Sequence, residues 1–336
     1  MFDKITIQID NISQNECEHL ARVHFLRVVS NGATGEITGY MSSSKYSQTS
    51  GTYVVITIKN GIRSVKLTTS LHKLWNKRTI GGKLRNDNLF TISEAKLAFS
   101  MFLSENGLLP GRVKIVYFEI GLNLPVSGEP TTFIHLARAG IFRGSKGEFR
   151  RKSIYIDANY IINKQKTTEK NKHIRKVYKI YDKSHEVREK ERGTKNKPKL
   201  PPDPLSPKII RIETIYKRRS EPAIAFFSDS NIHRLVTYFY LDWKDLFFIR
   251  KIKAYKGARK SEIDKAEKII NLGSEYYLEL IKKEFEAKKL TEKQYRTIRE
   301  FIRDFQDNRD KYIEIKSNEE KEYKLLFNRE LKKAKQ

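Results

Sequence analysis

Apolar and polar residues alternate along several short stretches in the first part of the chain. In Phe2–Asp10 the apolar positions Phe2, Ile5, Ile7 and Ile9 would share one face, as in a half-buried strand. Similar patterns predict strands at Val23–Val29, Tyr53–Lys59 and Arg63–Thr69, with a turn at Asn60-Gly61 between the last two. The opening block therefore predicts an antiparallel sheet.

The pattern continues as strands mixed with a few helices as far as Pro222. A short helix is predicted at Ser70–Asn76, and Ser93 is expected to cap an amphipathic helix over Glu94–Glu105. The predicted strands are Val113–Leu124, Thr132–Phe142 (paired with it through a turn at Ser127–Pro130), the segments around Tyr155 and Tyr160, Arg175–Asp182 and Lys208–Tyr216.

After Pro222 the periodicity is helical throughout. One helix is expected from a cap at Ser230 or Asn231 through Trp243 and Phe248, followed by helices at Ser261–Leu272, Ser274–Lys288 and Thr291–Asn308 and a last one from Asn318. The sequence thus predicts an α+β domain at 1–222 and an all-helical domain at 223–336. The helical domain is either a DNA reader of the helix-turn-helix type or a packing or dimerising appendage, so a homodimer stays open.

The net charge of the chain indicates a protein that binds a polyanion. The chain has 67 Lys and Arg against 40 Asp and Glu, a net charge of +27, and the segment 143–219 alone carries 24 basic and nine acidic residues. Such an excess indicates nucleic acid as the partner, with a membrane surface or an RNA-rich assembly as alternatives. The basic loop predicted at Lys190–Pro207 is either a DNA-contacting insertion or a spacer.

Cysteine content and hydropathy bear on the compartment. A single cysteine, Cys17, excludes an internal disulfide framework and favours a reducing cytoplasm. The N-terminus has no apolar signal-peptide run, and no stretch of about 18 apolar residues predicts a membrane span.

The stretch Arg175–Glu186, RKVYKIYDKSHE, combines residue types that suit phosphoryl chemistry. Tyr178 and Tyr181 lie among lysines, and Asp182 is placed to start a turn or cap a helix beginning near Lys183. Cations would gather a DNA phosphate, carboxylates would hold a divalent metal, and a phenol would attack phosphorus. The alternative is a basic strand whose tyrosines simply pack on a sheet.

Two glutamates stand out in the predicted strands. Glu119 interrupts an apolar run, where a carboxylate requires either a salt bridge or a bound cation. Glu213 shares a strand face with Arg211, so an ion pair is the simplest interpretation there. His135 is expected to be a structural strand histidine, and no His-x-His pair occurs in the chain.

In order and spacing, several of these segments resemble the filamentous-phage replication endonuclease (gene II/gene X) family and, more distantly, plasmid rolling-circle replication-initiation factors. The segments that carry the resemblance cover residues 1–220: FDKITIQID, VKLTTSLHKLW, YFEIGLNLPV, VYKIYDKSHE and RIETIYKR. The resemblance implies a nickase-like domain that cuts one strand of duplex origin DNA and stays joined to the 5′ phosphate through a tyrosine.

The resemblance also assigns roles to residues. It places the nucleophile at Tyr181, with Tyr178 as the reserve, and Lys183 as the cation at the scissile phosphate. Glu119 and Glu213 match the family's Mg²⁺- or Mn²⁺-binding carboxylates, although the family often has Asp where this chain has Glu119 and an acidic or polar residue at Asn123. The cations expected to contact DNA are Arg175, Lys176, Lys179, Arg211, Lys217 and Arg218.

The implied reaction is a transesterification that leaves a 3′-OH to prime a host polymerase. No GxxxxGK[ST] motif occurs, so a host helicase is expected to unwind the duplex and free the displaced single strand. Two other classes remain open: a non-catalytic initiator that binds and melts an origin, and a structural RNA-binding protein.

Overall fold

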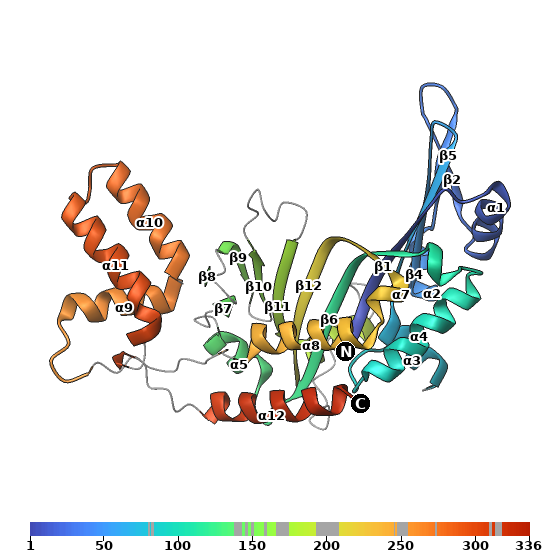
Figure 1. Ribbon diagram of the computed structural model, residues 1–336. Helices are drawn as coiled ribbons and strands as arrows, with labels where there is room; N and C mark the ends of the chain where they lie inside the picture. Colours follow the sequence, from blue (N-terminus) through green and yellow to red (C-terminus); the bar gives the residue numbers. More distant parts are fainter. Residues whose placement is uncertain are drawn as a thin grey trace.

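The computed structural model describes residues 1–79, 81, 84–137, 143–144, 147–148, 151–157, 160–165, 175–192, 208–244, 246, 255–272, 274–308, 311–312 and 318–336. Ten of the described strands form one antiparallel sheet in the order β2-β3-β4-β5-β1-β6-β12-β11-β10-β9 (Figure 1). Their bounds are β1 Phe2–Asp10, β2 Arg27–Ser30, β3 Ile37–Met41, β4 Thr52–Lys59, β5 Ile62–Ser70, β6 Lys114–Pro125, β9 Arg151–Asp157, β10 Tyr160–Gln165, β11 Arg175–Asp182 and β12 Ile209–Pro222. A separate two-stranded ribbon pairs β7 (Arg143–Gly144) with β8 (Gly147–Glu148).

The mixed α and β character and the antiparallel sheet predicted from the sequence are confirmed. The helices lie mainly in the second half of the chain. The α-helices are α1 Gln14–Val23, α2 Ser44–Ser50, α3 Leu71–Thr79, α4 Ile92–Glu105, α5 Pro130–Leu136, α6 Lys183–Arg192, α7 Ala223–Phe226, α8 Asp229–Trp243, α9 Lys260–Leu272, α10 Ser274–Glu286, α11 Glu292–Asn308 and α12 Asn318–Ala334.

The two faces of the sheet differ in what covers them. Apolar side chains such as Ile120, Ile180 and Ile212 pack with residues of α4, α7, α8 and α12 into one continuous core. Figure 1 shows α8 and α12 running across this side of the central strands. The opposite face carries the polar residues that alternate with this core, as expected for an antiparallel sheet with one face buried.

The predicted hairpin at Asn60-Gly61 is confirmed. Lys59 pairs with Ile62, so the loop has two residues, and both Asn60 (φ 51°) and Gly61 (φ 73°) adopt the left-handed conformation. Positive φ at both positions is what a type I′ hairpin turn requires, which explains the Asn-Gly pair.

Two predicted strands are wrong in whole or in part. Val23 ends α1 instead of beginning a strand, and pairing in that region starts only at Arg27. The segment predicted as the strand Thr132–Phe142 begins as helix α5, because Pro130 fits the first turn of a helix. His135 therefore lies in a helix, while residues 138–142 lie outside the described part, as does Phe248 of the predicted α8 end.

The packing does not divide the chain at residue 222. Helices α7, α8 and α12 contribute Phe226, Phe239 and Phe327 to the core of the sheet. A second core, built from residues such as Ile269, Ile281 and Phe305, joins α9, α10 and α11, with Tyr312 packed into it. The helical region after 222 is thus split between two cores. No helix in the described ranges is both long and apolar enough to cross a membrane.

Candidate active site on the polar face of the sheet

Strand register brings Glu119 of β6, Tyr181 of β11 and Glu213 of β12 onto one face. Tyr181 pairs with Arg211, and Lys179 pairs with Glu213. Glu213 in turn faces Gly121, the residue between Glu119 and Asn123 on that side of β6. Directly opposed residues of antiparallel strands share a face. Tyr181, Glu213 and Glu119 therefore point the same way, as the proposed chemistry needs.

A third carboxylate, from Asp3 of β1, completes the group. Asp3, Glu119 and Glu213 are buried, and one oxygen of each lies within 4.8 Å of the others. A register irregularity between Phe2 and Ile5 inserts one extra residue into β1 beside Asp3. Such bulges re-aim side chains next to sites. Sequence reasoning missed Asp3, although two polar residues in a row between Phe2 and Ile5 break the alternation and signal the bulge.

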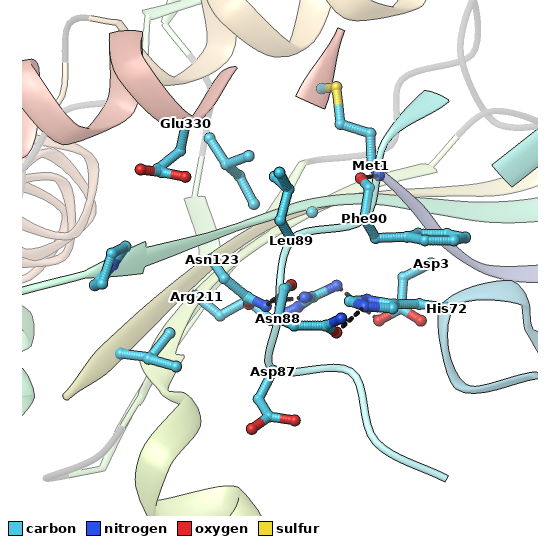
Figure 2. Close-up of a pocket in the computed structure, with 14 residues that line it drawn as sticks. Met1, Asp3, His72, Asp87, Asn88, Leu89, Phe90, Asn123, Arg211 and Glu330 are labelled. Atoms are coloured by element: carbon cyan, nitrogen blue, oxygen red, sulfur yellow. Dashed lines mark hydrogen bonds and ion pairs between the residues drawn. The ribbon is translucent and has the colours of Figure 1, made fainter. Parts of the chain in front are cut away.

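Arg211 holds two of the three carboxylates together. Its Nη2 donates to Asp3 Oδ2 at 2.6 Å and its Nη1 to Asn123 Oδ1 at 2.8 Å (Figure 2). Its Nε donates to Glu213 Oε1 at 2.6 Å. A Cβ on Gly121 would lie 2.6 Å from Nη2, so the guanidinium needs the glycine beneath it. Arg211 is only 2% exposed, so its prediction as a DNA-contacting residue is wrong: it is an internal ion-pair partner.

Asp3 is held ionised although it is buried. Burial opposes the charge, but the positive charge of Arg211 foremost, with a hydrogen bond from Ser70, brings the pKa of Asp3 below its ordinary value. Asn86 Nδ2 also donates to Asp3 Oδ2 at 2.7 Å. Asp3 is thus a preorganised carboxylate in the site.

The Tyr181 hydroxyl donates a hydrogen bond to one of these carboxylates. The phenol oxygen lies 2.9 Å from Glu213 Oε1. Burial, followed by the negative charge of Glu213, raises the pKa of Tyr181 well above its ordinary value. The phenol is therefore protonated unless additional positive charge enters the site.

Lys183 supplies one cation nearby. Its Nζ lies 6.0 Å from the centre of the Tyr181 ring and donates to Asn86 Oδ1 at 2.7 Å and Glu186 Oε2 at 2.5 Å. As predicted, α6 begins at Lys183, and the preceding Asp182 accepts from the backbone N–H of His185 at 2.8 Å. The turn thus fixes Lys183, 1% exposed, beside the ring of Tyr181.

Tyr178 does not belong to the site. It lies three residues before Tyr181 on the same strand and so points to the other face, where it is 1% exposed. Its hydroxyl donates to Asp242 Oδ1 of α8 at 3.2 Å. Lys176 lies on that face too, 3.0 Å from Asp242 Oδ2, so its predicted contact with DNA is wrong as well.

The remaining predicted DNA-contacting cations lie on the site's face or outside the described side chains. Lys179 is about one-third exposed, with its Nζ 3.9 Å from Glu213 Oε2. Lys217 is exposed and pairs across the sheet with Tyr117. The side chains of Arg175 and Arg218 lie outside the described part of the chain.

The donor set fits a hard divalent cation. Three carboxylates converge, and Arg211 compensates only part of their charge. The excess is visible at Glu119, whose pKa is raised from 4.5 to about 7 by burial first and then by Glu213 and Asp3. Oxygen-only ligands at this density suit Mg²⁺ or Mn²⁺.

A cavity of about 210 Å³ opens next to Asp3 and Arg211 (Figure 2). His72 and Asn88 line it, joined by a 2.6 Å hydrogen bond between His72 Nε2 and Asn88 Oδ1. Burial lowers the pKa of His72 to about 3, so the imidazole is neutral. It supports the loop beside the carboxylates without adding charge.

Replacing Glu119 by glutamine is expected to change stability in a pH-dependent way. Without metal, the pKa of Glu119 is 4.5 in the unfolded chain and about 7 in the folded protein. Between these two pH values the unfolded chain carries an ionised Glu119, whereas the folded protein keeps the carboxyl protonated. At about 1.4 kcal/mol per pKa unit, wild-type stability loses roughly 3 kcal/mol as pH rises through this window. Glu119→Gln escapes that loss, so the variant should match wild type at pH 5 and exceed it at pH 8.

Urea unfolding at both pH values, in EDTA and then in Mn²⁺, measures this. Taking the difference between variant and wild type cancels the opposite pH dependence of His72, which is the same in both proteins. Mn²⁺ should stabilise wild type at pH 8 and the variant much less. An equal difference between the two proteins at pH 5 and pH 8 would show that Glu119 carries no buried charge.

Comparisons with protein-family models, with curated proteins and with solved structures found no match for this chain.

Proposed function

We propose that this protein is a rolling-circle replication initiator: a metal-dependent, site-specific DNA nickase and strand transferase with a nickase-like sheet domain. The observation that carries the proposal is the 2.9 Å hydrogen bond from the Tyr181 hydroxyl to Glu213, one of three carboxylates gathered within 4.8 Å. A phenol beside a carboxylate cluster, in a chain of net charge +27, suits attack on a DNA phosphate.

In the proposed reaction Tyr181 Oη attacks the scissile phosphorus. A P–O bond to tyrosine forms, the bond from phosphorus to the 3′ oxygen breaks, and that oxygen leaves as a 3′-OH after taking up a proton. Glu213, which already accepts the hydrogen bond from Tyr181, is placed to receive the phenolic proton. One phosphodiester replaces another, so the reverse reaction can close the strand without a nucleotide cofactor.

The other residues of the site orient the carboxylates and balance their charge. Asp3, Glu119 and Glu213 would hold Mg²⁺ or Mn²⁺, which when bound supplies positive charge that polarises the phosphate and favours the phenolate. Arg211 fixes the orientation of Asp3 and Glu213. The Lys183 charge, 6.0 Å from the Tyr181 ring centre, also favours the phenolate. A host polymerase would extend the 3′-OH, and a host helicase would free the displaced strand.

A second candidate, a non-catalytic initiator that binds origin DNA, is favoured by one observation. Arg211 satisfies both Asp3 and Glu213 at 2.6 Å, so much of the cluster is neutralised by the protein itself. In that case the carboxylates would serve to hold β1 and β12 together, and Tyr181 would be a structural hydrogen-bond donor.

A trapping experiment separates the two functions. Supercoiled plasmid carrying the DNA that adjoins the coding region is incubated with the protein and Mn²⁺, then digested with nuclease and protease. The nickase should yield nicked circles and a nucleotide-modified peptide containing Tyr181, and EDTA should suppress both. Specific binding of the same DNA with neither nick nor modified peptide would support the binding protein instead.

A further inference from the structure

The polar face of the sheet continues away from the carboxylates across β6, β1, β5 and β4. Register places Tyr117, Thr6, Thr68 and Tyr53 in one row over these four strands. Thr6 Oγ1 and Thr68 Oγ1 are 2.9 Å apart, which confirms that they share a face. Tyr117 lies two residues before Glu119, and its hydroxyl donates to that carboxylate. The row therefore begins at the candidate active site.

Two tyrosine rings, Tyr117 and Tyr53, share this face with several cations. Lys4 Nζ lies 5.9 Å from the centre of the Tyr117 ring. The next row places Met41, Val55 and Lys66 side by side, with Arg27 opposite Met41. Lys4, Lys66, Arg27 and Tyr53 are all exposed. We call Lys4, Thr6, Tyr53, Lys66, Thr68 and Tyr117 the open sheet face.

We propose that the open sheet face binds the single-stranded DNA that adjoins the cleavage site and leads it to Tyr181, an inference that rests on the proposed function. The exposed ring of Tyr53 and the half-buried ring of Tyr117 offer stacking surfaces for unpaired bases. The exposed lysines on the same face would neutralise the phosphates. In duplex DNA the base faces are stacked on each other, so the rings would have nothing to stack against.

The dimensions fit a short single strand. Neighbouring strands of a sheet are about 4.8 Å apart, so the five intervals from β6 to β2 span roughly 24 Å. A fully stacked strand advances about 3.4 Å per nucleotide, so the span accommodates at most roughly seven nucleotides, and fewer where bases leave the stack to lie on the rings. Met41, 38% exposed, and Tyr53, 36% exposed, provide contact surface toward the far end of this path.

Binding measured in EDTA tests this surface independently of cleavage. The probes are a fluorescent 20-nucleotide oligothymidine and a 20-base-pair duplex, each titrated with the full-length protein. The double variant Tyr53→Ala/Lys66→Glu should bind the single strand about 5- to 100-fold more weakly, since stacking and a phosphate contact are both lost. The matched control Tyr53→Phe/Lys66→Arg keeps ring and charge and should bind like wild type.

The competing outcomes are distinct. Unchanged single-strand affinity of the double variant, or a loss confined to the duplex probe, overturns the proposed path. Photocrosslinking of iodouracil-substituted oligonucleotide should label peptides of β4 or β6, and labels confined to α9–α11 would also overturn it. If wild type binds through this face but never forms a Tyr181 adduct, the path stands and the nickase fails. If the double variant binds the single strand as wild type does and still forms the Tyr181 adduct, the proposed path is wrong and the nickase function stands.

Discussion

Replacing Tyr181 by phenylalanine is expected to abolish strand cleavage and the covalent adduct while leaving the fold and DNA binding intact. The substitution removes one oxygen, the atom that lies 2.9 Å from Glu213 Oε1. Loss of a nucleophile that no neighbouring group replaces lowers such reactions by about 10³-fold or more. The measurement is the rate of conversion of supercoiled plasmid to nicked circle in Mn²⁺, together with the DNA affinity of the variant.

Tyr178→Phe is the matched control, because it makes the same chemical change on the same strand three residues away. Tyr178 donates to Asp242 on the helix-covered face, so its loss should cost about 1–3 kcal/mol of stability and leave the nicking rate close to wild type. Normal nicking by Tyr181→Phe would remove Tyr181 from the mechanism. Loss of nicking in both variants, with both still folded, would show that the strand rather than its phenol matters.

Strand alternation predicted the centre of this site well. Because β11 and β12 alternate apolar and polar residues, the pattern predicted strands that carry Tyr181 and Glu213. The glutamate in the apolar run of β6 was predicted to need a salt bridge or a cation, and it lies in a carboxylate cluster. Side chains alternate between the two faces of a strand, so Tyr178 and Tyr181, three residues apart, lie on opposite faces. Composition alone does not distinguish the two tyrosines.

What the sequence did not predict depends on contacts between distant segments. Asp3 enters the site only because a bulge turns it toward Arg211, 208 residues away along the chain. The strand pattern indicated the ion pair between Arg211 and Glu213, which the structure shows. It could not reveal that Asp3 is a second buried partner, so Arg211 was still predicted to contact DNA. Helix α12 rejoins the core of the sheet after the separate core of α9–α11, and no local signal predicts that return.

Replacing Arg211 by methionine is expected to destabilise the protein by about 3–5 kcal/mol, the usual result of removing one partner of a buried ion pair. The guanidinium is 2% exposed and donates to Asp3, Glu213 and Asn123, so its loss leaves two buried carboxylates without their cation. Methionine fills a similar volume, which limits the contribution of a cavity. Urea unfolding in EDTA followed by circular dichroism measures the change.

Lys114→Met provides the matched control for that loss. Lys114 also pairs with a carboxylate, Asp10 at 3.0 Å, but both side chains are over 40% exposed, so the variant should lose less than about 1 kcal/mol. Adding Asp3→Asn to Arg211→Met should recover part of the stability, because one uncompensated charge is then removed. Equal stability of the Arg211 and Lys114 variants would mean that Arg211 does not hold the carboxylates together. If the expected difference is found, Arg211 keeps the site assembled before any metal or DNA binds. The negative charge of Glu119, which Arg211 does not neutralise, is the charge that a bound metal would balance.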